Sequence, residues 1–285
     1  MRQASAQLIA FLAARTPCHM GDLFTVQLLD GTAWRWTAYD RSLVVGGQTW
    51  LCARDGAPLV SRNRFAVRNT VEVPELELRL AAQDALLSNL KRQIHNGLFD
   101  GARIELDRAF MPVPGDTSLG AVLLFNGRQS NAVIDAEGVT LTAKGDNVLM
   151  NQQAPRNLYQ TTCLHTFCDA GCALSESAFA LGGNAGAGST AGNVTWGVIP
   201  TNPALYTLGK LTMLDGAAAG QICTVRLATN TGLSLTYPLY NAPSAGDAFT
   251  VVQGCDRNMT TCQNTYNNLQ HFRGYPFVPQ AEFGV

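Results

Sequence analysis

The sequence predicts a mostly β protein with a few short helices, an α+β fold in which strands dominate. Three observations lead to this prediction. Several segments alternate apolar and polar residues, as half-buried strands do. Turn pairs such as Asp30-Gly31, Gly46-Gly47 and Asn126-Gly127 separate these segments. Helical spacing is confined to short stretches, while the 46% apolar content of the 285 residues is enough for a large core or two modest ones.

The N-terminal half is predicted to start with a short amphipathic helix and to continue as strands. Ala4, Leu8, Phe11 and Leu12 follow helical spacing, and Thr16-Pro17 ends this stretch. The other predicted elements are β-hairpins or strands at 22–52, 65–80 and 101–110, a hairpin at 122–129 around Asn126-Gly127, two short strands at 133–143, and a helix at 82–96 that ends at Gly97.

The chain after residue 180 is predicted to be a β-module inserted between two cysteine-bearing segments. Residues 181–195 are small and Gly-rich, which indicates either a loop tip or an ordered contact between subunits. Three strand candidates follow at 206–214, 221–229 and 233–239. The predicted division is a β-rich region with an N-terminal helix at 1–160, cysteine-bearing segments at 161–180 and 250–285, and the inserted module at 181–249.

The charge content argues against several classes of partner. The net charge is −1, and no basic stripe indicates binding to nucleic acid or to an anionic membrane surface. Only 14% of residues are charged, below the roughly 25% of ordinary domains, which favours a surface covered by other subunits. No run of about 18 apolar residues predicts a membrane-spanning helix. The first fifteen residues lack the features of a signal peptide, so we expect synthesis in a reducing cytoplasm.

Four of the eight cysteines form two pairs, Cys163 with Cys172 and Cys255 with Cys262. The spacings are C-x8-C and C-x6-C, and 82 residues separate the pairs. In a reducing compartment such cysteines are more often thiols or metal ligands than disulfides. Zinc sites usually use closer pairs, whereas a [4Fe–4S] cluster takes one cysteine for each iron. The residues alone leave a cluster, zinc and disulfides open.

The segment GCDRNMTTCQNTYNNLQHFRGYPFVP at 254–279 resembles the C-terminal ending of the tail-tip hub proteins of long-tailed phages and gene transfer agents. The N-terminal layout is similar too, with a short helix, the segment LLDGTAWRWTAYD, a Trp before Gly-Ala-Pro, and Asp-Gly-Ala at 100–102 before a strand. The residues that match the C-terminal pattern are Cys255, Asp256, Cys262, Tyr266, Asn268, Phe272, Arg273, Gly274, Tyr275, Pro276, Phe277 and Pro279.

This resemblance implies a structural subunit of the virion tail tip, made in the cytoplasm of a bacterial host. It implies a homotrimer with two β-barrel-like domains per chain, below the distal tail protein ring and above a central hub or tail fibre protein. It also implies a [4Fe–4S] cluster held by Cys163, Cys172, Cys255 and Cys262, with a structural rather than a redox role. Cys168 lies between the first two ligands and is an alternative to either. The tail from Phe272 to Phe277 is expected to pack over the cluster.

Two competing functions are weighed against this one, namely a tail-associated cysteine or zinc hydrolase and a metal-free β-rich binding module. His165 and His271 are candidate ligands or catalytic bases, but no nucleophile signature surrounds Cys163, so we expect no enzyme activity. Asp256 is expected to cap a turn. Cys18, Cys52 and Cys223 are expected to be buried inert thiols.

Aromatic and basic residues of the N-terminal region have simpler interpretations than ligand binding. Trp34, Trp36 and Trp50 are expected to be core or interface anchors rather than a sugar-binding platform. Arg62, Arg64 and Arg68 alternate with apolar residues and are expected on the solvated or partner-facing side of a strand. A less favoured alternative is that they line a lumen through which DNA passes.

Overall fold

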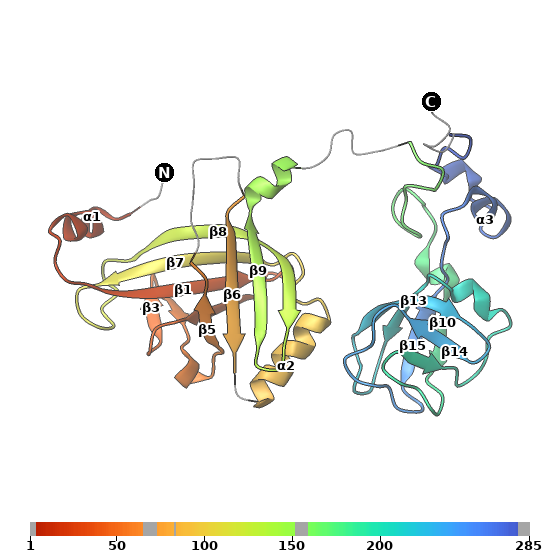
Figure 1. Cartoon of the computed structure of the whole chain (residues 1–285), viewed down its shortest axis with the longest axis horizontal. Helices are drawn as coiled ribbons and strands as arrows, with labels where there is room; N and C mark the ends of the chain where they lie inside the picture. Colours follow the sequence, from red (N-terminus) through yellow and green to blue (C-terminus); the bar gives the residue numbers. More distant parts are fainter. Residues whose placement is uncertain (1–3, 65–72, 83, 152–158, 279–285) are drawn as a thin grey trace. The chain divides into compact units, whose positions relative to one another are not determined.

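The computed structural model describes residues 4–64, 73–82, 84–151 and 159–278. The chain forms two compact units, residues 1–152 and 153–285, and each is described by itself (Figure 1). Strands make up 36% of the structure and helices 16%, and both large sheets curl, one into a nearly closed barrel and the other into a half-barrel. The predicted mostly β fold with two barrel-like parts and short helices is therefore confirmed.

The first unit is built on a seven-stranded antiparallel sheet with the order β2-β1-β7-β8-β9-β6-β5. A separate hairpin of β3 and β4 turns at Gly46-Gly47, where both glycines have positive φ. The strands are β1 His19–Gln27, β2 Ala33–Thr37, β3 Leu43–Val45, β4 Gln48–Trp50, β5 Leu59–Arg62, β6 Glu75–Ala81, β7 Arg103–Met111, β8 Ala121–Ile134 and β9 Val139–Gly145.

Period-two patterning accounts for the core of this sheet. Leu76, Leu78 and Leu80 of β6 are all 0% exposed, whereas Glu77 and Arg79 between them face solvent. Strand β6 begins directly after Pro74, and the part of the predicted 65–80 element at residues 65–72 lies outside the described residues. The predicted hairpin of β1 and β2 is confirmed, with Thr25 opposite Arg35.

Two α-helices belong to the first unit, α1 Ala6–Ala13 and α2 Asp84–His95. Ser5 caps α1 because its Oγ accepts a hydrogen bond from the backbone N–H of Leu8 at 3.1 Å. On α2, Leu90 and Ile94 are buried in the core of the sheet, and Gly97 has a φ of 77°, which suits a C-cap glycine. Both predicted helices are confirmed. The 3₁₀ helices here are η1 Ala53–Asp55 and η2 Asp146–Asn151.

The predicted hairpin at Asn126-Gly127 is wrong, because β8 runs straight through these residues for 14 positions. A Cβ on Gly127 would lie 2.3 Å from the carbonyl oxygen of Lys144 on β9. Glycine therefore serves close strand approach here rather than a turn. The turn between β8 and β9 lies at Asp135–Gly138, where the Asp135 carboxylate accepts hydrogen bonds from the backbone of Glu137 and Gly138.

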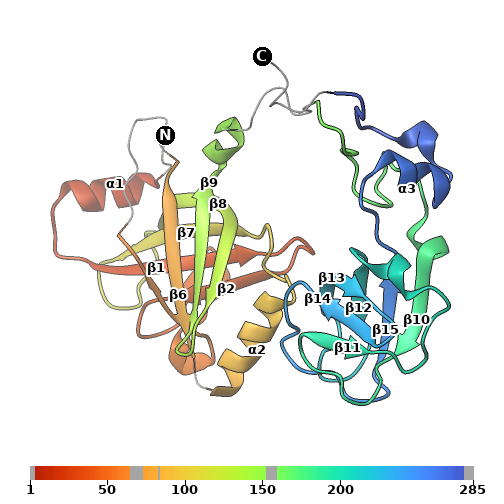
Figure 2. The ribbon, with the colours of Figure 1, turned by 45° about the vertical axis from the view of Figure 1, so that its right-hand side comes forward.

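The second unit contains a six-stranded antiparallel sheet with the order β10-β15-β12-β13-β14-β11 (Figure 2). A bridge between Ala185 and Trp196 links the ends of its two edge strands. The strands are β10 Ala180–Asn184, β11 Asn193–Thr195, β12 Lys210–Met213, β13 Ile222–Ala228, β14 Gly232–Leu235 and β15 Ala248–Val252. The sheet thus runs from 180 to 252, slightly beyond the range predicted for the inserted module, and the domain division stays a prediction.

The small-residue stretch 181–195 begins in edge strand β10 and ends in edge strand β11, and residues 185–192 between them form the connecting turn, so it is not simply a loop tip. A Cβ on Gly186 would lie 2.5 Å from the carbonyl oxygen of Trp196, so a larger residue would push the edges apart. The three later strand candidates are confirmed in shorter form. The first is shorter partly because the 3₁₀ helix η4 Pro203–Tyr206 ends inside its predicted range.

The cysteine-bearing segments on either side of this sheet contain little regular structure. They hold one short α-helix, α3 Met259–Asn264, and the 3₁₀ helices η3 Glu176–Phe179 and η5 Leu269–His271. Within the described ranges, no helix has the length and apolar character needed to cross a bilayer.

Candidate functional site

The two cysteine-bearing segments pair with each other, although the whole six-stranded sheet separates them in sequence. The backbone N–H of Cys163 donates to the carbonyl of Arg257 at 2.8 Å. The N–H of Leu164 donates to the carbonyl of Arg273 at 3.3 Å. The first cysteine loop is therefore joined to the second by backbone hydrogen bonds at two places.

Asp169 organises the first loop, between Cys163 and Cys172. Its carboxylate accepts hydrogen bonds from the backbone N–H groups of Thr166 at 2.9 Å, Gly171 at 2.9 Å and Cys172 at 2.6 Å. Burial alone would raise the pKa of Asp169, but these bonds and the nearby His165 hold the pKa below its usual range. Sequence analysis missed this residue, although an Asp two positions before a Gly is typical of such turns.

Asp256 organises the second loop, as predicted. Its carboxylate accepts hydrogen bonds from the backbone N–H of Asn258 at 2.9 Å and from Thr261 Oγ1 at 3.0 Å. Burial opposes ionisation, but the hydrogen bonds outweigh it and lower the pKa of Asp256. The carboxylate thus ties the chain after Cys255 to the first turn of α3, the helix that carries Cys262.

Three aromatic rings pack together beside the cysteines. The ring centroid of Tyr266 lies 4.6 Å from that of Phe167 and 5.4 Å from that of Phe179. The Tyr266 hydroxyl donates a hydrogen bond to the carbonyl of Gly254. Burial, reinforced by Cys255 nearby, raises the pKa of Tyr266. These contacts fix the end of β15 against the first loop.

Each of the four predicted ligand sulfurs makes one hydrogen bond. Three of them accept from an N–H group, an arrangement that stabilises a thiolate, and the fourth donates to a carbonyl. The contacts are Arg257 N to Cys255 Sγ at 3.3 Å, Arg273 N to Cys163 Sγ at 3.4 Å, Asn268 Nδ2 to Cys172 Sγ at 3.6 Å, and Cys262 Sγ to the Asn268 carbonyl at 3.3 Å.

The four thiols share one electrostatic environment. Burial raises the pKa of Cys262, and the thiols of Cys163, Cys255 and Cys172 raise it further. Burial likewise raises the pKa of Cys255, to which Cys172 and Cys163 contribute. The thiols of the two pairs thus influence each other's ionisation, and the assignment of all four to one site stays a prediction. In the part of the chain that the structure describes, no three His, Cys, Asp or Glu side chains are gathered closely enough to hold a metal ion.

Cys168 lies near the same group. Its backbone has a φ of 62°, an uncommon value for cysteine. Burial raises its pKa to about 11, with contributions from Cys172 and Glu176. Its role as an alternative ligand stays a prediction.

The remaining candidate residues are three other cysteines and His271. Cys52 is buried and its thiol donates to Asp55 Oδ2 at 3.3 Å. Cys18 and Cys223 are only half-buried, so the prediction of fully buried thiols is wrong for these two, although Cys223 packs against the core of its sheet. His271 is half-buried in η5.

The aromatic tail does not cover the cysteines as expected. Phe277 is 90% exposed and points largely into solvent, and Tyr275, 47% exposed, packs edge-to-face on Tyr159 with ring centroids 4.6 Å apart. Phe272 is half-buried, and Gly274 lies so close that its Cβ would be 2.6 Å from Phe272 Cζ. Phe272 is thus enclosed by the chain around it, whereas Phe277 is not.

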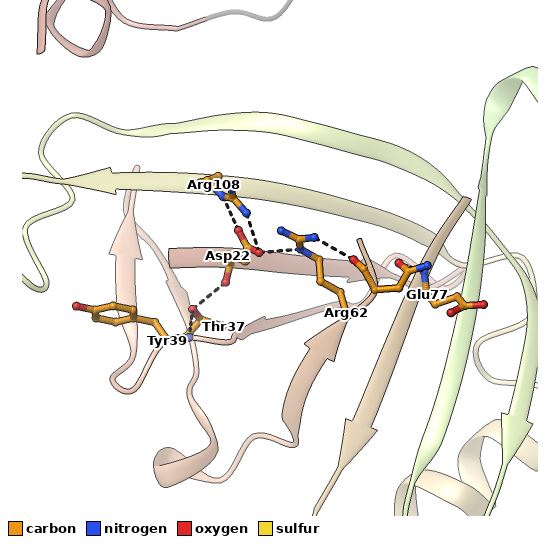
Figure 3. A network of polar contacts seen from close by, with 7 residues as sticks. Asp22, Thr37, Tyr39, Arg62, Glu77 and Arg108 are labelled. Carbon is orange, nitrogen blue, oxygen red and sulfur yellow. Dashed lines mark hydrogen bonds and ion pairs between the residues drawn. The ribbon is translucent and has the colours of Figure 1, made fainter. Parts of the chain in front are cut away.

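A second polar cluster lies in the first unit, centred on Asp22 of β1 (Figure 3). Its carboxylate accepts from Arg62 Nε at 2.7 Å and from Arg108 Nε at 2.7 Å. Burial alone would raise the pKa of Asp22, but the two guanidinium groups lower it overall. Arg62 is therefore not on a solvated face as predicted, whereas Arg64 is exposed and Arg68 lies outside the described residues.

This cluster joins opposite ends of the seven-stranded sheet. Asp22 belongs to β1, next to one edge of the sheet, and Arg62 ends β5, the opposite edge. The two strands share no ladder of backbone hydrogen bonds. The ion pair therefore links two strands of the curled sheet that are not neighbours. Sequence analysis did not identify this ion pair.

The three predicted tryptophans are core residues. Trp36 is 6% exposed and Trp50 8% exposed, while Trp34 packs edge-to-face on Phe99 with centroids 5.1 Å apart. Trp50 Nε1 donates to Thr25 Oγ1 at 3.2 Å. These contacts confirm that the rings are core anchors and leave no exposed aromatic platform at these three positions.

Comparisons with known proteins agree with the architecture. A comparison with curated proteins found no match. Residues 204–282 match the family described as "Phage conserved hypothetical protein BR0599". A chain of a solved structure, "Virion of native gene transfer agent (GTA) particle", is similar in fold, with a TM-score of 0.73 and 21% identity over 99% of this chain and 95% of that chain. Residues 5–175 match the family described as "Baseplate hub protein, N-terminal attachment domain". The chain belongs to the baseplate hub protein family.

Proposed function

We propose that this baseplate hub protein is a non-enzymatic tail-tip subunit whose C-terminal unit is fastened by a [4Fe–4S] cluster. Its family places the chain in the tail of a phage or phage-like particle. The proposed ligands are Cys163, Cys172, Cys255 and Cys262. The observation that carries the proposal is that the two cysteine-bearing segments, distant in sequence, are joined by backbone hydrogen bonds from Cys163 and Leu164.

The chemical type of the donors suits such a cluster. All four donors are thiols, and sulfur-only ligation favours an iron–sulfur cluster or zinc over cations that prefer oxygen. Hydrogen bonds from N–H groups to Cys163, Cys172 and Cys255 are of the kind that tune the potentials of such clusters. When bound, the cluster would supply four strong bonds between the two segments.

A structural role is supported by loop closure. Ligation would close a loop of 82 residues between Cys172 and Cys255. In the chain-entropy picture, one cross-link across such a loop stabilises the closed form by about 4 kcal/mol. The two loops need this support because little regular structure surrounds them apart from α3 and two 3₁₀ helices.

We further propose assembly as a homotrimer between the distal tail protein ring and a central hub or fibre protein. The low charge content supports extensive burial in an assembly. So does α1, an uncharged helix of which only Leu8 is buried, while Ile9 is 58% and Leu12 41% exposed. Replacement of Ile9 and Leu12 by Ser should reduce trimer formation, measured by sedimentation of the purified chain; unchanged sedimentation would contradict this role of α1.

The experiment that tests the cluster is anaerobic purification after expression with added iron. We expect a brown protein with about four irons and four sulfides per chain. Each of the four single Cys→Ser variants should lose colour, whereas Cys223→Ser, on a strand of the six-stranded sheet, should retain it. A colourless parent protein, or one that binds a single zinc, would refute the cluster.

The same variants separate this proposal from a hydrolase. If the chain hydrolysed a peptide or cell-wall substrate and Cys163→Ser abolished turnover while assembly persisted, the non-enzymatic proposal would be wrong. We expect instead that the cysteine variants lose cluster and assembly together.

A further inference from the structure

Asn268 contacts cysteines from both pairs, Cys172 through its side chain and Cys262 through its backbone. It is 4% exposed and precedes η5. Its Nδ2 donates to the carbonyl oxygen of Cys172 at 2.7 Å and to Cys172 Sγ at 3.6 Å. Its backbone N–H donates to the carbonyl of Cys262 at 2.9 Å, and its own carbonyl accepts from the Cys262 thiol.

These contacts span the two loops by different means. The bonds to Cys262 use the backbone of Asn268 and stay within the second cysteine segment, so they survive any substitution of this side chain that keeps the local fold. The bonds to Cys172 come from the side-chain amide and cross 96 positions of sequence. The link between Cys172 and the second segment at this place therefore depends on the Asn268 side chain itself.

We infer that Asn268 is a positioning residue for the cysteine site, which holds Cys172 against the second pair and donates an N–H to its sulfur. The inference rests on the cluster proposed above and assigns one residue outside the ligand set to its formation and properties. A buried amide of this kind satisfies a carbonyl that would otherwise lose its partner, and it directs the adjacent thiol.

An N–H donor on a ligand sulfur stabilises the more negative, reduced form of a cluster. Loss of the donor should therefore shift the midpoint potential to a more negative value. Loss of an outer residue that orients a ligand typically weakens metal retention by about 10- to 100-fold. Both effects are expected when Asn268 is replaced by Asp, which keeps the size but cannot donate from its ionised carboxylate.

The test compares Asn268→Asp and Asn268→Ala with Asn264→Asp, a charge-matched change at an exposed residue that ends α3. Each full-length protein is purified anaerobically, and three quantities are measured: the rate at which a chelator removes iron, the midpoint potential, and the visible and paramagnetic spectra. We expect iron loss at least about tenfold faster in both Asn268 variants, a more negative potential in Asn268→Asp, and parental behaviour in Asn264→Asp.

A measurement on iron-free protein tests the inference independently of the proposed cluster. In iron-free protein, iodoacetamide should label Cys172 faster in both Asn268 variants than in the parent, as mapped by peptide mass spectrometry. If the parent binds no cluster, the proposed function fails regardless of Asn268. If the parent binds a cluster and both Asn268 variants match Asn264→Asp in iron loss, potential and Cys172 labelling, Asn268 has no positioning role.

Discussion

Replacement of Asp22 by Asn should destabilise the first unit selectively. The carboxylate accepts three hydrogen bonds from two guanidinium groups, at 2.7 Å from Arg62 and at 2.7 Å and 3.2 Å from Arg108. The amide of Asn is neutral and has one acceptor oxygen instead of two, so at least one of these hydrogen bonds and the full negative charge between the two guanidinium groups would be lost. The link across the curled sheet would be weakened accordingly.

The magnitude follows from the exposure of the three side chains. Asp22 is 15% exposed, Arg62 20% and Arg108 26%. Breaking a fully buried pair costs about 3–5 kcal/mol, and an exposed pair is worth about 0–1 kcal/mol. Because both arginines reach solvent in part, we expect a loss of about 2–3 kcal/mol of unfolding free energy.

The assay is urea unfolding of the full chain, followed by tryptophan fluorescence. Three of the four tryptophans, at positions 34, 36 and 50, lie in the first unit, so its transition dominates the signal. With a denaturant slope of about 2 kcal/mol/M, the midpoint should fall by about 1 M. The control is Asp40→Asn, whose side chain is 61% exposed and lies 3.9 Å from Arg41.

The pH dependence provides a second check. The pKa of Asp22 is lower in the folded state than its unfolded value of about 3.9, so its contribution is fully present above that pH. The difference between the parent and Asp22→Asn should be constant from about pH 7 to pH 5 and should shrink as the pH falls below about 4. A midpoint shift no larger than that of Asp40→Asn at pH 7 would refute the reasoning.

Three further predictions concern single contacts. Gly127→Ala should destabilise the first unit by at least about 2 kcal/mol in the same urea assay, because the new Cβ would lie 2.3 Å from the Lys144 carbonyl oxygen. The control is Gly182→Ala, which has open space around it and should leave the stability of its own unit unchanged. Tyr266→Phe should lower the stability of the second unit by about 1 kcal/mol through loss of the bond to Gly254, seen in thermal unfolding; an unchanged transition would contradict it. Removal of iron from protein purified anaerobically should lower the melting temperature of the second unit and leave that of the first unchanged, as measured by calorimetry; equal shifts in both would argue against a local cluster.

Much of the candidate site was accessible from the sequence, but not the contacts that assemble it. The spacing of Cys163, Cys172, Cys255 and Cys262 and the resemblance to hub proteins identified the candidate residues, and the structure joins the two segments that carry them by backbone hydrogen bonds. The roles of Asp169 and Asn268 were not identified, because a carboxylate in a turn and an amide in a motif say nothing about their partners. The partners of Asp169 lie two or three residues away in one local turn, whereas Asn268 reaches Cys172 across 96 positions, a contact that only folding creates.

Local patterns in the sequence determined which segments form strands and helices. Tertiary contacts decided which of these segments pack or pair with one another. Leu76, Leu78 and Leu80 alternate with charged residues, so β6 could be predicted from period-two burial alone. Gly127 looks like a turn residue locally, yet it lies inside β8, because the approach of β9 excludes a side chain there. The pairing of Asp22 with Arg62 likewise depends on the curl of a seven-stranded sheet, a long-range property that no short segment carries.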